Sequence, residues 1–441
     1  MNRAIRLMLA LALAVLALPS TLAVAQEPVE VVYWLWDANQ LPPYRACGDL
    51  FQESHPDITI KIEQFGWDDY WATLQTTFVT GDAPDVFTNQ LSKHPEFVNL
   101  GQEMDIAPLI ERDNVPTDIY IEGLFELWTK DDAIYGLPKD WDTVAVVYNV
   151  EMFEAAGIDP AIMETWDWNP VDGGTFEQVI AQLTLDANGN NGLSPDFDKD
   201  NVVQWGFISR GASNAGQTEW SHWAVSNGFQ HTNGIWGDEY YYDDPRLIET
   251  FQWYADLALV KGYAPSFAEV DSLGPQALFS AERGAMTTDG SWMINSYVHD
   301  SDFEVGFGLL PIGPEGRKSM FNGLADGIWV GTQHPEEAWE WFKFLASPDC
   351  LNIVGDSGVV FPATPESTER SLAAHEEQGV DVSAYVDEAL DPEGTFLYPI
   401  TDHGSEITRI LEETFDLILI GETTAAEALP RANEQVNALF D

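Results

Sequence analysis

Short motifs that carry enzymatic chemistry are absent from this chain of 441 residues. The sequence contains no His-Glu-x-x-His metal motif, no Gly-x-Ser-x-Gly nucleophile motif and no Gly-x-x-x-x-Gly-Lys phosphate loop. Glu219 and His222 have the spacing of two metal ligands on one helix face, but no third ligand accompanies them. Paired carboxylates are unavoidable among 73 acidic residues, so they give little indication of glycoside hydrolysis. These observations favour a protein that is not an enzyme.

One run of oxygen-bearing side chains matches the opening of a calcium loop. In the segment 186–192, side-chain oxygens stand at the first, third and fifth positions, as such a loop requires. Asn191 stands where the loop's invariant Gly belongs, and Phe197 stands where its bidentate Glu belongs. No cofactor is otherwise required, and a solvated acidic loop is the alternative. We hypothesise a structural calcium ion whose ligands are Asp186, Asn188, Asn190, Gly192, Asp196 and Asp198, with Asp200 able to complete the shell.

Aromatic and polar side chains also stand at the ends of the first predicted strands. Alternation and helical spacing predict strands at 29–36, 58–62 and 85–87, with helices at 44–54 and 68–80 between them. This order predicts a parallel α/β sheet, in which ligand groups gather at the carboxyl ends of the strands. Trp36 and Asn89 fall at such ends.

The rest of the chain continues the α/β pattern. We expect a strand at 143–148, helices at 249–260 and 336–345, and two or three helices over 405–440. Trp253, Trp339 and Trp341 lie on the apolar faces of these helices and are assigned to the core. A single core stops growing at roughly 250–300 residues. Since no linker or repeat divides this chain, we expect two lobes that exchange segments.

The N-terminus has the features of a secretory signal peptide at 1–25. Arg3 and Arg6 precede the apolar run 7–18, and Ala23-Val24-Ala25 gives a small-x-small cleavage pattern. A membrane anchor is the alternative, but the run is shorter than the roughly 20 residues that span a bilayer. No Cys follows the cleavage site, so a lipid anchor is not indicated. We expect an exported protein, periplasmic or extracellular.

Charge and cysteine content restrict the partners. The formal net charge of −54 repels nucleic acid and anionic lipid, so neither is an expected partner. Export permits a disulfide between the two cysteines, Cys47 and Cys350, but their distance in sequence leaves the pairing to the fold. Two unpaired thiols are the default expectation.

Five strings, in order along the chain, resemble the extracellular solute-binding proteins of ABC importers, family 1, of the maltose-binding type. The strings are Trp34-Leu35-Trp36, Gly81-Asp82-Ala83-Pro84-Asp85-Val86, Tyr135-Gly136-Leu137-Pro138 running into Val147-Tyr148-Asn149, Phe279-Ser280-Ala281-Glu282-Arg283-Gly284-Ala285-Met286 before Gly290-Ser291-Trp292, and Pro335-Glu336-Glu337-Ala338-Trp339 ending at Phe344-Leu345-Ala346-Ser347-Pro348. Each string is weak alone, but the five stand in the order of the family, and the resemblance covers essentially the whole predicted mature chain.

The resemblance implies a two-lobed α/β fold of the periplasmic-binding-protein type II, with the ligand cleft between the lobes. Each lobe is expected to be a mainly parallel sheet flanked by helices. By this pattern the first lobe comprises 26–139 and 310–348, and the second comprises 140–309 and 349–441. The chain is expected to cross between lobes near 137–142, 306–311 and 346–350.

The resemblance also implies a set of ligand-binding residues, which supply aromatic rings for stacking on a sugar and polar groups for its hydroxyls. Asp142 matches an acidic sugar-ligand position, Trp292 matches a cleft tryptophan, and Glu219 and Trp220 lie near a position that carries a stacking aromatic. The complete expected set is Trp36, Asp37, Asn39, Asn89, Gln90, Asp140, Asp142, Glu219, Trp220, Trp292, Asn322 and Asp326.

The function implied is a carbohydrate-binding receptor that delivers a sugar to the permease subunits of an ABC transporter, as a monomer. Another small solute, such as a polyol or a glycerol-phosphate compound, is the alternative ligand. A secreted carbohydrate-active enzyme is the alternative from another class, and turnover of an oligosaccharide would distinguish it.

The acidic surface also makes a prediction about salt. Self-repulsion among so many carboxylates is screened by ions, so a saline environment is our hypothesis and an ordinary acidic secreted protein is the alternative. We expect the thermal unfolding midpoint to rise clearly as monovalent salt is added. A flat or falling midpoint would contradict the hypothesis.

Overall fold

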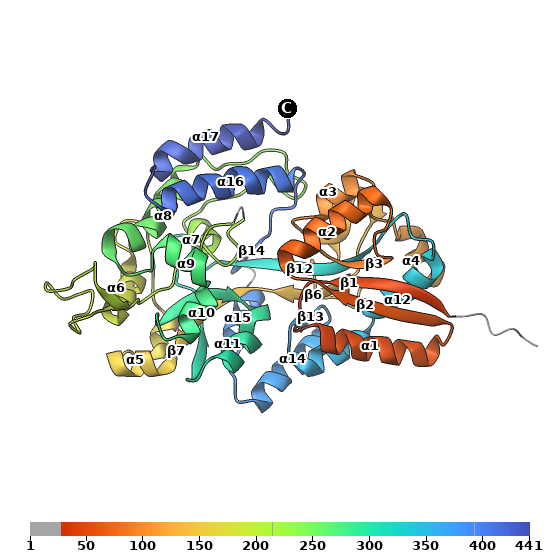
Figure 1. Ribbon diagram of the computed structural model, residues 1–441, viewed down its shortest axis with the longest axis horizontal. Coiled ribbons are helices and arrows are strands. Elements are labelled where there is room, and N and C mark those ends of the chain that lie inside the picture. Colours follow the sequence, from red (N-terminus) through yellow and green to blue (C-terminus); the bar gives the residue numbers. More distant parts are fainter. Residues whose placement is uncertain (1–27, 214, 392) are drawn as a thin grey trace, which may run out of the picture.

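A computed structural model describes residues 28–213, 215–391 and 393–441. The predicted signal peptide at 1–25 lies outside the described residues. Two bodies lie side by side, each with its own sheet and helices, and strands β6 and β12 run between them (Figure 1). Among the described residues, no helix combines the length and the apolar character that crossing a membrane requires.

The first body is built on a mixed seven-stranded sheet in the order β13-β6-β12-β3-β1-β2, with β14 beside β12. Strands β1, β2 and β3 are parallel, whereas β12 runs antiparallel to β3 and β6. The three N-terminal strands and the two helices between them form as the sequence pattern predicts. The elements of this body are β1 (Val29–Leu35), α1 (Leu41–Ser54), β2 (Ile58–Gln64), α2 (Trp67–Thr80), β3 (Val86–Gln90), α3 (His94–Asn99), α4 (Ala107–Asp113), β4 (Thr129–Lys130), β5 (Ala133–Ile134), β6 (Pro138–Asp142), β12 (Ser319–Ile328), α12 (Pro335–Leu345), α13 (Pro348–Ser357), β13 (Phe361–Pro362), α14 (Pro365–Glu377) and β14 (Thr395–Leu397). Helix α15 (Ser383–Leu390) contacts β12 and also packs on the sheet of the second body (Figure 1).

The second body contains a three-stranded sheet in the order β10-β7-β11. Both outer strands run antiparallel to β7, so the expectation of a mainly parallel sheet is wrong for this body. Strand β7 continues directly from β6, and the later strands β10 and β11 return against it. Its elements are β7 (Val144–Asn149), α5 (Val150–Ala156), α6 (Gly174–Leu183), β8 (Leu185–Asp186), β9 (Val202–Gln204), α7 (Ser221–Ser226), α8 (Pro245–Asp256) with a π-helical turn (Leu257–Lys261), α9 (Phe267–Leu273), α10 (Pro275–Ser280), β10 (Met286–Gly290), α11 (Ile294–Asp300), β11 (Val305–Gly308), α16 (Gly404–Leu419) and α17 (Ala425–Asn437).

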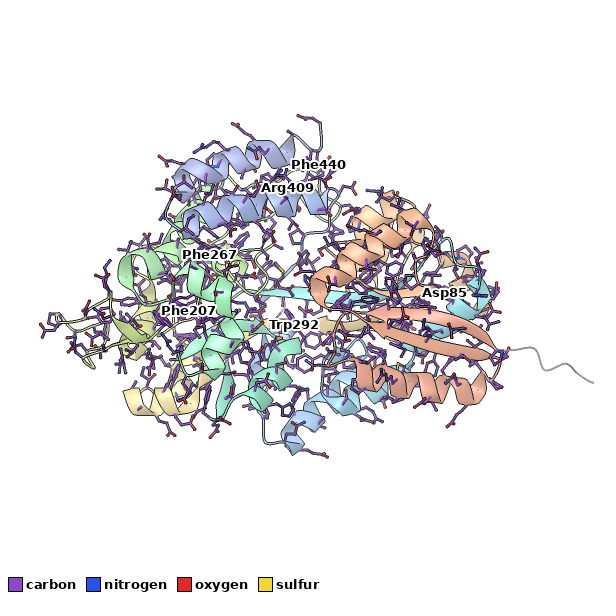
Figure 2. All side chains as sticks on the ribbon, viewed as in Figure 1. Asp85, Phe207, Phe267, Trp292, Arg409 and Phe440 are labelled. Carbon is purple, nitrogen blue, oxygen red and sulfur yellow. A yellow bond between two sulfur atoms is a disulfide. The ribbon has the colours of Figure 1, made fainter. Side chains whose placement is uncertain are left out.

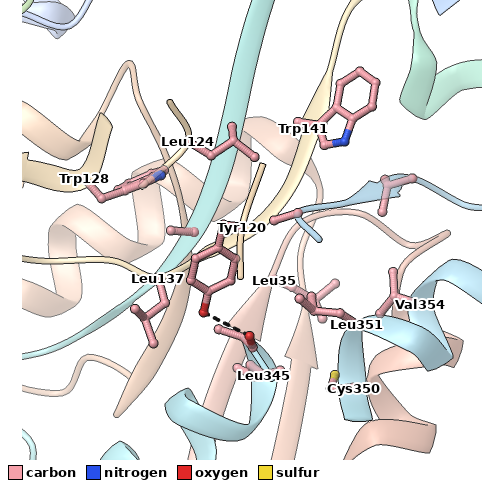
Figure 3. Close-up of a cluster of buried hydrophobic side chains, with 14 of the residues drawn as sticks. Leu35, Tyr120, Leu124, Trp128, Leu137, Trp141, Leu345, Cys350, Leu351 and Val354 are labelled. Carbon is pink, nitrogen blue, oxygen red and sulfur yellow. Dashed lines mark hydrogen bonds between the residues drawn. The ribbon is translucent and has the colours of Figure 1, made fainter. Parts of the chain in front are cut away.

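Each body has its own aromatic-rich core. The first core contains Leu35, Trp128 and Trp141, and the Tyr120 hydroxyl donates to the Ala346 carbonyl at 3.0 Å (Figure 3). Trp339 and Trp341 are buried in this core, and Trp253 is buried in the second, so the three core assignments made from helical spacing are confirmed.

The packing changes from the first core to the second later in the chain than expected. The predicted crossing at 346–350 does not change cores, because Leu345, Cys350 and Val354 all belong to the first. Ile400 still belongs to the first core and Ile407 to the second. In this part of the chain, α13 packs against α1, and α14 packs against β13. The first core also contains Ala145, Ala215 and Ile294 of the second body, so core membership does not locate the lobe boundary, and the boundary expected at residue 349 stays a prediction.

A disulfide joins Cys47 of α1 to Cys350 of α13, with the two Cα atoms 5.2 Å apart. The default expectation of two unpaired thiols is wrong. Because the two cysteines are 303 residues apart, the sequence does not indicate that they pair. The packing of α1 against α13 brings the two side chains together. The disulfide fixes α13, which follows β12 and α12, to the first helix of the chain.

Removing the disulfide should destabilise the protein. We expect the Cys47→Ala/Cys350→Ala variant to lose about 2–5 kcal/mol of unfolding free energy, because the cross-link restricts the unfolded chain. Denaturant unfolding with and without reductant measures this loss. In the double variant the reductant should have no effect. An unchanged midpoint on reduction of the wild-type protein would contradict the prediction.

Candidate ligand-binding site

A pocket of about 420 Å³ lies where the two bodies meet. The first body supplies most of its wall, and Gln217 and Trp292 come from the second. Trp292 lies between the two bodies in Figure 2. The lining residues are Trp36, Asp37, Ala38, Gln40, Trp67, Gln90, Asp140, Trp141, Asp142, Gln217, Trp292, Asn322, Leu324 and Val360.

Strand alternation positions the polar part of the pocket. Asp140 and Asp142 are two residues apart on β6, so they share one face of the sheet. Asn322 on the neighbouring strand β12 pairs in register with Asp142. Lys139 comes directly before these aspartates on β6, and its Nζ donates to the Tyr33 hydroxyl of β1 at 3.0 Å. The site therefore has its carboxylates on the pocket side of the strand and its lysine on the far side.

Aromatic rings form the apolar walls. The Trp36 and Trp67 rings lie 5.2 Å apart and perpendicular, and Trp67 is 45% exposed. The Trp292 ring covers Gly290, where a Cβ atom would come within 1.9 Å of the ring. Glycine at 290 therefore lets Trp292 lie flat along its own backbone.

Several hydrogen-bonding groups in the pocket are already engaged. Gln217 Nε2 donates to Asp142 Oδ1 at 2.6 Å, and Gln40 Nε2 donates to Asp37 Oδ2 at 3.1 Å. Two buried acceptors, Asp140 Oδ2 and Asn322 Oδ1, have no hydrogen-bond partner within the described part of the chain. A buried acceptor without a partner is unfavourable, so these atoms need donors from a ligand or from water.

Burial dominates the acid–base behaviour of the pocket. The pKa of Asp140 is raised to about 7, chiefly by burial, while Lys139 lowers it and the nearby carboxylates of Asp326 and Asp37 raise it. Burial also raises the pKa of Asp142 well above its ordinary value, and Asp140 adds to the effect. The pKa of Asp37 is raised, again chiefly by burial.

The pocket contains seven of the twelve residues expected from the sequence: Trp36, Asp37, Gln90, Asp140, Asp142, Trp292 and Asn322. A further expected residue, Asn39, lies exposed nearby, where its Nδ2 donates to Ser296 Oγ of the second body at 3.4 Å. Glu219 does not line the pocket. It accepts from the Ser213 hydroxyl at 3.2 Å and lies close to Arg210.

Three expected residues have structural roles elsewhere. Asn89 is fully buried and donates to Glu103 at 2.7 Å, because strand alternation turns it away from the face of Gln90. Asp326 accepts from Tyr33, Thr88 and Lys139 inside the sheet. Trp220 is fully buried in the second core, where it packs 5.3 Å from Phe415.

The sequence pattern did not identify Gln40, Trp67 and Gln217 as lining residues. Trp67 is the first residue of α2, and its place beside the end of β1 could have indicated the pocket. Gln217 follows an irregular segment in the second body and reaches Asp142 only through the fold.

The predicted calcium loop is closed by its own hydrogen bonds. Asp186 Oδ1 accepts from the backbone N–H groups of Asn188 and Asn190, each at 2.8 Å, and its Oδ2 accepts from the N–H of Asp198 at 2.9 Å. No three His, Cys, Asp or Glu side chains converge as a metal site anywhere in the described ranges. Calcium binding stays a prediction that this arrangement does not support.

Neutralising Asp140 should stabilise the protein. A carboxyl group whose pKa is raised to about 7 on folding binds its proton more tightly in the folded state, so stability falls as pH rises from about 4 to about 7. The Asp140→Asn variant lacks this titration, and its melting temperature should exceed that of the wild type by a margin that grows over this range. The gain in unfolding free energy of the variant over the wild type is about 4 kcal/mol at most.

Thermal unfolding from pH 4 to pH 8 measures this margin. Asp82→Asn, which neutralises an exposed carboxylate in the turn after α2, is the control and should show no such growth. A margin for Asp140→Asn that stays constant across the range would contradict the assignment.

Comparisons with known proteins agree with this architecture. The chain is 27% identical over 141 residues to the arabinooligosaccharide-binding protein of Halalkalibacterium halodurans, a match that covers 31% of each chain. The chain therefore spans, in this match, about a third of that relative's length. The structure resembles that of UspC from M. tuberculosis with a TM-score of 0.73, at 25% identity, over 93% of this chain and 100% of that chain.

A second solved structure, the ABC substrate-binding protein Lmo0181 of Listeria monocytogenes in complex with cycloalternan, superposes with a TM-score of 0.80 at 21% identity, over 94% of this chain and 99% of that chain. These structures share the two-lobed fold of periplasmic binding proteins, which confirms the expected fold class. The family model described as bacterial extracellular solute-binding protein matches residues 37–349. Since that match covers most of the chain, the protein belongs to the bacterial extracellular solute-binding protein family.

Proposed function

We propose that this protein is an exported receptor that binds a carbohydrate and delivers it to the permease subunits of an ABC transporter. One observation carries the ligand class: the pocket combines the rings of Trp36, Trp67 and Trp292 with buried acceptors that have no partner in the described chain. A sugar presents apolar C–H faces that pack on aromatic rings and hydroxyls that donate to acceptors. The name of the arabinooligosaccharide-binding relative supports the same class.

The position of the pocket supports a receptor that closes on its ligand. Gln217 and Trp292 come from the second body and face the carboxylates of the first. A ligand that touches both bodies favours the closed arrangement by the contacts that only this arrangement permits. The permease would then recognise the closed form. We propose a monomer outside the cytoplasmic membrane, without enzymatic activity.

The lining argues against the alternative ligand that carries phosphate. Among the described residues that line the pocket there is no Lys or Arg, whereas Asp37, Asp140 and Asp142 are all present. A phosphate group would meet carboxylates rather than the basic side chains that normally hold it. A neutral polyol stays compatible with these groups.

Sugars should stabilise the protein selectively. In a thermal-shift panel of mono- and oligosaccharides, a ligand at 100 times its Kd should add about 2.7 kcal/mol of stability, because it binds the native state alone. This corresponds to a rise of about 3 °C in a protein of this size. No shift with any sugar, on protein shown to be folded, would contradict the proposal, and turnover of an oligosaccharide would favour an enzyme.

Trp292→Ala should weaken the binding of the sugar found in this panel by about tenfold or more, because it removes a stacking face. The control is Phe440→Ala, which truncates an aromatic residue far from the pocket (Figure 2). Calorimetric titration of the two variants should give a lower affinity for Trp292→Ala alone. Equal affinities would exclude Trp292 from the binding surface.

A further inference from the structure

We infer that the ligand carries a protonated amine: the pocket selects an amino sugar, or an oligosaccharide of amino sugars, over a neutral sugar of the same shape. This inference rests on the proposed carbohydrate-binding function and specifies its ligand. Charge, hydrogen-bonding capacity and aromatic surface each support it.

The pocket has an excess of negative groups. Three carboxyl groups, from Asp37, Asp140 and Asp142, line it, and none of its described lining residues is a Lys or Arg. The nearest ammonium group belongs to Lys139 and is engaged on the other side of β6, where Nζ lies 3.3 Å from Asp326 Oδ1. It also donates to Thr88 at 3.2 Å. Lys139 still lies close enough to lower the pKa values of Asp140 and Asp37, so it compensates these carboxyl groups in part, and a cation in the ligand would supply further counter-charge.

The hydrogen-bonding capacity of the pocket is also unbalanced. The amides of Gln217 and Gln40 already donate to Asp142 and Asp37. The buried polar atoms of the lining that lack a partner in the described chain are both acceptors, Asp140 Oδ2 and Asn322 Oδ1. An ammonium group offers three donors and no lone pair, whereas a hydroxyl brings one donor and two lone pairs. The ammonium group therefore matches these acceptors better, and its charge strengthens each bond.

The aromatic walls suit a cation as well as a sugar ring. Trp36, Trp67 and Trp292 line the same pocket as the carboxylates. The face of an indole ring attracts cations, and tryptophan does so more strongly than other aromatic residues. A ring that bears an ammonium group can thus stack on tryptophan and bond to a carboxylate at once.

Binding of a cation should be linked to pH. The charged or titratable groups around Asp140 are Asp37 after β1, Tyr44 of α1, Lys139 and Asp142 of β6, and Asp326 of β12. Burial raises the pKa of Asp140 to about 7, so much of this group is protonated below neutrality in the free protein. A bound ammonium group favours the carboxylate and expels the proton. Affinity for the amine should therefore rise with pH from about 5 to about 7, where the carboxyl group becomes ionised.

The experiment is calorimetric titration of the protein with matched sugars. The series is glucosamine, N-acetylglucosamine and glucose, together with the β-1,4-linked dimer of each, at pH values from about 5 to about 7. We expect the amine to bind at least about tenfold more tightly than its acetylated and hydroxyl counterparts, which corresponds to 1.4 kcal/mol or more. Its affinity should rise with pH, and the affinity of the neutral sugars should change less.

Asp140→Asn removes one carboxylate while keeping the shape of the side chain. This variant should lose more affinity for the amine than for the neutral sugars, so the ratio between them falls. Asp82→Asn is the matched control at an exposed position and should keep the wild-type ratio. An unchanged ratio in Asp140→Asn would overturn the role of this carboxylate and with it the inference.

The outcomes separate the two proposals. Tight binding of a neutral sugar, with no preference for the amine and no dependence on pH, would overturn the inference and leave the carbohydrate receptor standing. If no sugar of either kind binds to folded protein, the proposed function itself fails. Preferential binding of the amine with the predicted pH dependence would support both.

Discussion

The buried ammonium group of Lys139 is the interaction on which the site depends. It comes from β6 and donates to Tyr33 of β1 and Thr88 of β3, while it neutralises Asp326 of β12. It also lies 4.1 Å from the centre of the Tyr44 ring of α1. One charge thus connects four strands and a helix. Because a buried carboxylate without a partner is costly, Asp326 requires this lysine.

The same strand presents opposite electrostatic environments on its two faces. On one side of β6, Lys139 pairs with Asp326. Alternation turns Asp140 and Asp142 toward the pocket, where none of the described lining residues is a Lys or Arg. Burial is the main cause of the raised pKa values of these two aspartates, and Lys139 offsets it only in part for Asp140. Binding sites commonly keep such unfavourable groups because a ligand relieves them, and the stability lost there is supplied by cores elsewhere.

The cores and the disulfide hold the first wall of the pocket rigid. The disulfide of Cys350 links α13 covalently to α1. The same core contains Trp141, which also lines the pocket. The second wall belongs to a body with its own core, and it contributes Gln217 and Trp292. The packing of the two walls is not fully separate, because Ala145, Ala215 and Ile294 of the second body are buried in the first core and Trp292 packs against it. Closure around a ligand would therefore keep or rearrange these contacts where the two bodies meet.

Local patterns in the sequence were sufficient for much of the fold. Alternation and helical spacing predicted β1, α1, β2, α2 and α12, because each element buries a face that its own residues specify. The resemblance to solute-binding proteins predicted the two lobes and the half of the pocket near β1 and β6. Trp36 could be identified because it stands at the end of a predicted strand, whereas Asp142 and its neighbour Asp140 were identified only through the resemblance.

Tertiary structure decided which polar residues face the pocket and which make hydrogen bonds or ion pairs in the protein interior. Asn89 and Gln90 are neighbours, yet strand alternation sends one to Glu103 and the other to the pocket. Asp326 resembled a ligand group until the fold placed Lys139 within 3.3 Å of it. Cys47 and Cys350 are 303 residues apart, and Gln217 approaches Asp142 from another body. The sequence by itself determined the elements, since their causes are local. The pairings depended on the fold, since burial and proximity exist only once distant segments have packed.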